Sequence, residues 1–219
     1  MAFPLSKIVN AGWVGRDKAS LMAHIKELEE EGIPAPKEVP ICFPIPLDRI
    51  TQDSAIEVID ESDHSGEVEY VLLFHRGSVY VTVGSDHTDR KIEVNGVPKA
   101  KVFYPNVVAK KAWRLGDVTK HWDELILRCR IHANNEKVLY QEAPLASIIG
   151  HEELIEFVKS KLVAPDNLDG LLVYSGTIAA KIRIQYSPVW DFELEDPVRK
   201  MKISHSYTCV PTGNWFNGE

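Results

Sequence analysis

The chain has few of the features that mark secreted or disulfide-stapled proteins. Its 219 residues include three cysteines, Cys42, Cys129 and Cys209, which lie far apart and show no Cys-x-x-Cys spacing. This odd, scattered set favours neither a disulfide framework nor a zinc site, and it fits a reducing cytoplasm. The N-terminus lacks a basic segment followed by an apolar stretch, so we expect no secretory signal.

Long apolar runs and basic stripes are also missing. No run approaches the ~20 apolar residues of a membrane-spanning helix. The net charge of −7, with no basic stripe to offset it, argues against nucleic acid as a partner. What is present is a mixture of 44% apolar and 26% charged residues, which is enough to bury a core. We expect residues 1–219 to form one domain.

The order of the sequence patterns predicts an α+β chain in which strands dominate. Residues 17–31 and 151–162 have helical periodicity, and Asp17 can cap the first of these helices. The proline-rich residues 33–46 predict extended backbone, because proline does not continue a helix. Residues 105–120 are ambiguous. Strand patterns recur at 55–94, 124–132, 137–142, 169–187 and 189–207.

A β-hairpin is predicted around Arg76 and Gly77, which stand between two runs of alternating apolar residues. A two-residue turn at this point fixes the register and gives one face of the hairpin a continuous row of apolar side chains. The other face then carries Glu67 and Glu69 on one strand and Asp86 on the next. Asp86 stands directly across from Glu67, at a Cβ separation of ~5 Å.

These three carboxylates can be read in two ways. Like charges placed opposite each other destabilise a sheet unless a positive charge lies between them, which favours a hard divalent cation with oxygen ligands. Alternatively, the Glu-x-Glu pattern is the solvated face of a half-buried sheet, and a three-residue turn, which Arg76 would tolerate better, moves Asp86 away. His87 points to the opposite face from Asp86, so we leave it out of the metal site.

Several short motifs follow one another along nearly the whole chain. They are His-x-x-Glu at His24 and Glu27, a proline-rich stretch reaching Phe43, Glu-x-Glu at Glu67 and Glu69, "SDHTDR" with Asp86, a lysine at Lys101, a hairpin with Gln141, the helix "EELIEF" and a Gly-Thr turn at Thr177. In this order they resemble the fumarylacetoacetate hydrolase superfamily. The sequences of the segments "AGWVGRD", "GSDHTDR" and "HWDEL" resemble a less characterised branch of this superfamily more than its well-known members.

The resemblance implies a mixed β-sheet roll or barrel and a homodimer. It also implies that Glu67, Glu69 and Asp86 hold Mg²⁺ or Mn²⁺, which binds a small 2-oxo or β-diketo carboxylic acid and stabilises its enolate. The leading function is an acylpyruvase-like hydrolase of C–C bonds. Decarboxylation, enol–keto tautomerisation and hydration share the same enolate and stay open, as do a non-catalytic acid-binding member of the fold and a purely structural domain.

The resemblance also assigns catalytic roles to three residues. His24 and Glu27 lie one helical turn apart, so Glu27 can orient the imidazole while His24 moves a proton or activates water. A solvated helix face is the alternative for this pair. Lys101 is expected to stabilise negative charge on the substrate, and its alternative is an ordinary surface lysine.

Three further residues are candidates for substrate binding. Gln141 and Thr177 can hydrogen-bond a carboxylate, although each can equally satisfy nearby backbone groups. Arg90 can bind a carboxylate, but a structural ion pair, for instance with Asp89, is favoured. The sequence departs from the family at Ile45, where a lysine is usual, and in the turn after Thr177, which weakens the assignment of the substrate more than that of the metal.

Overall fold

A computed structural model describes residues 3–19, 21–22, 25–26, 35–36, 38–59, 63–133 and 136–213. Strands dominate these residues, as the sequence predicts, and they form two sheets. None of the helices in this described part has the length and apolar character that a membrane crossing requires.

The first sheet has eight strands within the described residues, in the order β2-β1-β11-β5-β6-β7-β3, with β8 pairing on β6. The sequence-distant strands β1 and β11 are parallel neighbours, so the sheet is mixed. Its strands are β1 (Lys7–Gly12), β2 (Ile41–Ile45), β3 (Ile50–Thr51), β5 (His64–His75), β6 (Ser78–Asp89), β7 (Asn106–Val108), β8 (Trp113–Arg114) and β11 (Leu171–Tyr174).

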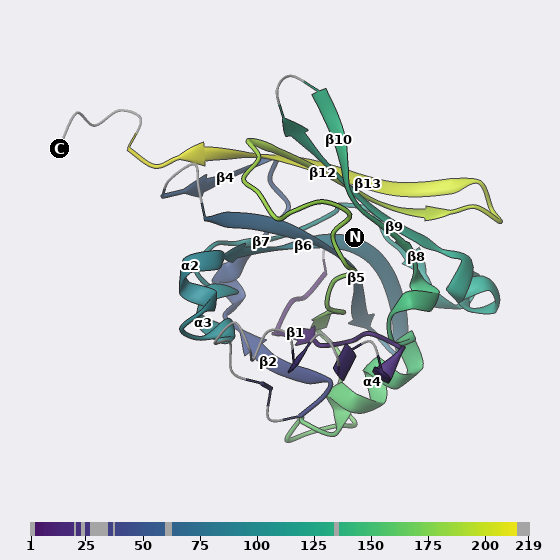
Figure 1. Cartoon of the computed structure of the whole chain (residues 1–219). Coiled ribbons are helices and arrows are strands. Elements are labelled where there is room, and N and C mark those ends of the chain that lie inside the picture. The colour runs from purple at the N-terminus through teal and green to yellow at the C-terminus, as the bar shows by residue number, and fades with distance from the viewer. Residues whose placement is uncertain are drawn as a thin grey trace.

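The second sheet has five strands in the described residues, in the order β10-β9-β12-β13-β4. Figure 1 shows it lying across the long, bent β5–β6 hairpin. Its strands are β4 (Ala55–Val58), β9 (Ile126–Ala133), β10 (Glu136–Pro144), β12 (Val189–Asp196) and β13 (Met201–Pro211).

The described helices are short and lie at the edges of the sheets (Figure 1). The α-helices are α2 (Arg90–Glu93), α3 (Val97–Ala100) and α4 (His151–Lys159). The 3₁₀ turns are η1 (Leu47–Arg49), η2 (Leu115–Asp117), η3 (Thr119–Glu124) and η4 (Leu145–Ser147).

The register of the β5–β6 hairpin is the one that the sequence predicts. Arg76 and Gly77 form the two-residue turn, with φ angles of 50° and 71°. Both angles are positive, as this hairpin turn requires, so the arginine adopts a conformation that glycine or asparagine usually fills. Glu67 pairs with Asp86 and Glu69 pairs with Gly84. The three-residue turn is therefore wrong.

The first sheet curls into a roll, and a single hydrogen bond between β1 and β6 shows the extent of this curvature. Strands β11 and β5 separate β1 from β6 in the sheet order. At a spacing of ~4.8 Å between neighbouring strands, a flat sheet would hold β1 and β6 ~14 Å apart. Instead, Asn10 Nδ2 on β1 donates to Asp86 Oδ2 on β6 at 3.0 Å. Their side chains meet across the interior of the roll.

Two apolar clusters hold this arrangement. The larger one packs between the two sheets and includes the fully buried Trp190, Tyr70 and Phe192. The smaller one fills the interior of the roll next to the carboxylates, and its buried members are Ile8, Ile45, Val71, Val108, Leu172 and Tyr174. The carboxylate patch thus continues an apolar surface, rather than facing solvent along its whole length.

Most predicted elements are present. The hairpin of β9 and β10 and the helix α4 match the predicted residues 124–142 and 151–162. Within 17–31, the described residues include helical Leu21 and Ile25, and Asp17 caps this segment by accepting from Ala19 N at 2.9 Å. Residues 105–120 resolve into β7, β8 and short turns. The strand predicted over 169–187 ends at Tyr174, after which the chain turns at Gly176 with φ of 85°.

A substitution at Gly84 tests the packing of the roll. A Cβ at this position would lie 2.6 Å from Tyr174 Cε1 and 2.8 Å from the backbone oxygen of Val107. We therefore expect Gly84→Ala to destabilise the protein by roughly 1–3 kcal/mol, which is typical of overpacking. Thermal unfolding measures this loss. The control is Gly116→Ala, where an added Cβ meets no described atom within 4 Å; an equal melting temperature for the two variants would contradict the packing.

Candidate metal centre

Three carboxylates converge inside the roll because of the hairpin register. Glu67 and Glu69 come from β5, and Asp86 comes from β6. One oxygen atom from each lies within 4.8 Å of the others. Glu69 and Asp86 are buried, and the side chain of Glu67 is 13% exposed. The reading of this pattern as a solvated sheet face is therefore wrong.

Lys101 places a positive charge among these carboxylates. Its Nζ donates to Glu67 Oε2 and to Asp86 Oδ2, each at 2.5 Å, and to Thr88 Oγ1 at 3.2 Å. The lysine follows α3 directly and is 7% exposed, so it is not an ordinary surface lysine. The patch thus already binds one cation, the ammonium group of the chain itself.

Arg90 lies on the outer side of Glu67. Its guanidinium donates to Glu67 Oε1 at 2.9 Å, to Ser65 Oγ at 2.6 Å and to Glu93 Oε2 at 2.7 Å. Asp89, the partner suggested by the sequence, instead caps α2 by accepting from Ile92 N at 2.8 Å. The favoured structural ion pair is present, with Glu67 and Glu93 as its acidic partners.

The surroundings separate the pKa values of the three carboxyl groups. Burial alone would raise the pKa of Glu67, but the charges of Lys101 and Arg90 lower it to about 2. Burial raises the pKa of Asp86 to about 6, against the opposing charge of Lys101. Burial and the nearby Asp86 raise the pKa of Glu69 well above its usual value. Near neutral pH, Glu67 and Asp86 therefore both carry negative charge beside the Lys101 ammonium, and a further cation would favour the ionised form of Glu69.

A hard divalent cation fits the donor set of this patch. All three side chains offer oxygen atoms, the ligands that Mg²⁺ and Ca²⁺ prefer. Gly176 N donates to Glu69 Oε2 at 2.8 Å, which fixes one of its oxygens. Asn10 adds an amide next to Asp86, and its Oδ1 is buried without a hydrogen-bond partner among the described residues. This unpaired Oδ1 beside the three carboxylates could bind a cation or accept a hydrogen bond from a hydroxyl group of a ligand.

Gln141 and Thr177 lie beside β5, where their side chains form hydrogen bonds with the backbone. Gln141 Oε1 accepts from Val68 N at 3.1 Å, and its Nε2 donates to Thr177 Oγ1 at 2.9 Å and to Ile178 O at 2.6 Å. Thr177 Oγ1 donates to Val68 O at 2.9 Å. Both side chains thus satisfy local backbone groups and hold the Gly-Thr turn against β5. His24 and Glu27 lie outside the described residues.

His87 points away from the carboxylates, as strand alternation predicts. Its Nε2 lies 2.7 Å from His64 Nδ1, and its Nδ1 lies 2.8 Å from the hydroxyl of Tyr207. Cys209 Sγ is 3.9 Å from the same Nε2. Burial lowers the pKa of His87 well below its usual value, so the ring is neutral. This buried network joins β5 and β6 to β13 in the other sheet.

Sequence reasoning missed the two asparagines of the roll. Asn10 lies in "KIVNAG" and Asn106 in "PNVVA", and both are fully buried. A single polar residue inside a short apolar strand was the available signal. It could not be interpreted without knowing that the sheet curls and brings β1 and β7 toward Asp86.

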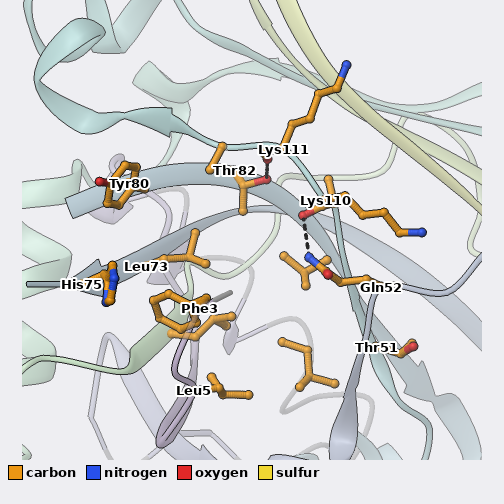
Figure 2. A pocket seen from close by; sticks show the side chains of 15 residues that line it. Phe3, Leu5, Thr51, Gln52, Leu73, His75, Tyr80, Thr82, Lys110 and Lys111 are labelled. Atoms are coloured by element: carbon orange, nitrogen blue, oxygen red, sulfur yellow. Dashed lines mark hydrogen bonds between the residues drawn. The ribbon is translucent and has the colours of Figure 1, made fainter. Parts of the chain in front are cut away.

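A separate pocket of about 790 Å³ opens at the other end of the roll. Its floor is apolar, with Phe3, Leu5 and Leu73, and none of its lining residues is acidic. Figure 2 shows the amino groups of Lys110 and Lys111 pointing away from this floor. The pocket offers no carboxylate for a hard cation, so the candidate metal centre is the carboxylate patch.

Comparison with solved structures defines the class of the fold. The protein Cg1458, solved with an inhibitor, matches with a TM-score of 0.69 and 19% identity over 96% of this chain and 78% of that chain. A 2-keto-3-deoxy-D-arabinonate dehydratase complexed with magnesium and 2,5-dioxopentanoate matches with a TM-score of 0.64 and 13% identity, over 95% and 75%. At these identities the likeness is one of fold, and the fold is that of fumarylacetoacetate hydrolase-type enzymes.

A third match is the 4-oxalocrotonate decarboxylase of Pseudomonas putida G7, complexed with magnesium and adipate, with a TM-score of 0.60 and 15% identity over 92% of this chain and 77% of that chain. Two of these structures thus hold magnesium, and the described residues of this chain include an acidic cluster that could hold a metal ion. A search of curated proteins finds no match.

The family itself is shown by the sequence. The family model described as "Protein of unknown function (DUF2848)" matches residues 11–207. The chain belongs to this family.

Metal binding can be tested by thermal unfolding. We expect Mg²⁺ or Mn²⁺ at ~100 times its dissociation constant to raise the melting temperature by about 5–10 °C, since this excess stabilises the native state by about 2.7 kcal/mol. Asp86→Asn should abolish the shift, and Glu124→Gln, an exposed carboxylate elsewhere, should keep it. A full shift in Asp86→Asn would show that the cation binds at another place.

Lys101→Met tests the charge balance of the patch. The substitution leaves Glu67 and Asp86 without their shared ammonium, and breaking such a buried pair typically costs about 3–5 kcal/mol. We therefore expect a lower melting temperature without metal and a larger metal-induced rise than in the wild type. A metal-induced rise smaller than that of the wild type would mean that the ammonium supports the ion instead of substituting for it.

Proposed function

We propose that this chain is a divalent-metal-dependent enzyme that acts on a small 2-oxo acid through its enolate. The observation that carries this proposal is the convergence of Glu67, Glu69 and Asp86 around a position that already attracts the Lys101 ammonium. Buried carboxylates that face one another need a cation, and oxygen donors select a hard one. We also propose that residues 1–219 form one catalytic domain.

In this proposal the three carboxylates hold Mg²⁺ or Mn²⁺. The bound ion supplies positive charge that stabilises the developing enolate. Asn10 holds Asp86 in place from across the roll, and Gly176 N holds Glu69. Arg90 keeps Glu67 ionised and oriented from its outer side.

The substrate is proposed to be an anion, because the patch offers two positive side chains, Lys101 and Arg90, that could bind it beside the metal ion. Lys101 is the better candidate to reach it, since its ammonium already lies inside the patch and can turn toward a carboxylate or an enolate oxygen. Arg90 is held by three partners and supports the site instead. The dehydratase and the decarboxylase with this fold were solved with dicarboxylate or oxo-acid ligands, which supports the same class.

The reaction type is the finer part of the proposal. The resemblance favours hydrolytic cleavage of a C–C bond, with His24 and Glu27 as the acid–base pair and Gln141 and Thr177 near the substrate. The names of the dehydratase and the decarboxylase favour loss of water or carbon dioxide next to the same enolate. A non-catalytic acid-binding protein is the alternative of a different class. A cytoplasmic location and a homodimer stay predictions.

The test is a panel of acylpyruvates, oxaloacetate and hydroxylated 2-oxo acids, assayed with and without Mg²⁺. We expect turnover with Mg²⁺, none with a chelator, and competitive inhibition by oxalate that needs metal, because oxalate mimics a chelating enolate. His24→Ala should fold normally and lose ~10²–10⁴ in kcat, the usual contribution of a general acid–base group. Product analysis separates hydrolysis, decarboxylation and dehydration.

Two outcomes would contradict the proposal. Turnover that is unaffected by chelation would remove the metal from the mechanism. Metal-dependent binding of oxalate without turnover of any member of the panel would favour the non-catalytic alternative.

A further inference from the structure

Asn106 is a buried polar side chain whose hydrogen bonds are unused. It is fully buried on β7, and neither its Nδ2 nor its Oδ1 has a hydrogen-bond partner among the described residues. An unpaired buried polar group is costly, and native proteins seldom keep one without a reason. Asn106 keeps a whole carboxamide in this state, whereas Asn10 keeps only its Oδ1.

The strand register places Asn106 beside the carboxylate patch. Gly84 pairs with Val108 and Ser85 pairs with Val107 in the antiparallel β6–β7 ladder. Extending this register by one residue sets Asn106 opposite Asp86. Alternation along β7 puts Asn106 on the same face as Val108, which belongs to the apolar cluster inside the roll. Asn106 therefore faces the interior from one side of Asp86, while Asn10 bonds to Asp86 from across the roll.

The unused atoms define the chemistry of a missing partner. A carboxamide presents a donor and an acceptor side by side. Its complement is a pair of neighbouring oxygens, one that accepts and one that donates. A carboxylate or an enolate oxygen satisfies only the donor, and an acylpyruvate in its diketo form carries no hydroxyl on its chain. With the Oδ1 of Asn10 also unpaired, the site has two orphaned acceptors, which a ligand bearing hydroxyl groups can fill.

We propose that Asn106 is a specificity-determining residue that binds a hydroxyl group of the substrate, with Asn10 as a second acceptor, so that the substrate is a hydroxylated 2-oxo acid. This inference rests on the proposed function and deepens it. The metal and Lys101 hold the oxo-acid end of the molecule, and the amide of Asn106 selects its hydroxylated chain. An analogue without the hydroxyl leaves the amide unpaired again, and sites built in this way discriminate strongly against it.

The experiment compares two ligands in three proteins. The ligands are 2-oxopentanoate and its dihydroxylated counterpart. The proteins are the wild type, Asn106→Leu, which has a similar volume and no hydrogen-bonding group, and Asn95→Leu, which makes the same change at an exposed asparagine. Dissociation constants are measured by thermal shift with saturating Mg²⁺, and the shift from Mg²⁺ alone is recorded for each protein.

We expect the wild type and Asn95→Leu to prefer the hydroxylated ligand by roughly ten- to a hundredfold, the range for one unpaired buried polar group. Asn106→Leu should lose this preference, chiefly by weaker binding of the hydroxylated ligand. Its melting temperature without ligand should equal or exceed that of the wild type, because the substitution removes an unsatisfied group. All three proteins should show the same shift with Mg²⁺ alone.

The other outcomes are distinguishable. An unchanged preference in Asn106→Leu, or no preference in the wild type, overturns the role of Asn106 while leaving the proposed function standing. A reduced Mg²⁺ shift in Asn106→Leu makes the residue part of the metal site and also overturns it. If neither 2-oxo acid binds the wild type, the proposed function itself fails. If Asn106→Leu does not fold, Asn106→Ala takes its place with the same expectations for ligand preference and for the shift with Mg²⁺ alone.

Discussion

The ionic contact between Lys101 and the facing carboxylates of Glu67 and Asp86 is the constraint on which the site depends. Two acidic side chains placed across a hairpin repel each other, and burial strengthens the repulsion because no water screens it. The ammonium at 2.5 Å from each offsets it. This balance lets a β-rich chain keep three carboxylates in the interior of its roll, where the proposed divalent ion and oxo acid would bind.

The geometry of the roll gives the carboxylate cluster one closed side and one more open side. Curling of the first sheet brings Asn10 on β1 to Asp86 on β6, although two strands separate them in the sheet order. The apolar cluster around Val71 and Tyr174 closes one side of the carboxylates, and Glu67 with Arg90 marks the more open side. On the far face, His87 and Tyr207 tie the hairpin to the second sheet, so the strands that carry the carboxylates are held from both sides.

The local part of this site could be predicted from the sequence and the long-range part could not. The Arg76–Gly77 turn fixes the register over twelve residues, and side-chain alternation then places Glu67 opposite Asp86 and turns His87 away. The positions of Lys101, Asn10 and Asn106 depend on sheet curvature and on β7 pairing with β6, which short-range patterns do not encode. For the same reason Gln141 and Thr177 fit a substrate role by motif, whereas their hydrogen bonds go to Val68 and Ile178.

The most direct measurement is a crystal structure of the protein grown with Mn²⁺, with anomalous diffraction data to locate the ion. We predict one strong anomalous peak within coordination distance of Glu67, Glu69 and Asp86, with the Lys101 ammonium moved from its contacts or turned to the open side. A peak at His64, His87 and Cys209 instead, or none in the roll at a manganese concentration that saturates the thermal shift, would contradict it.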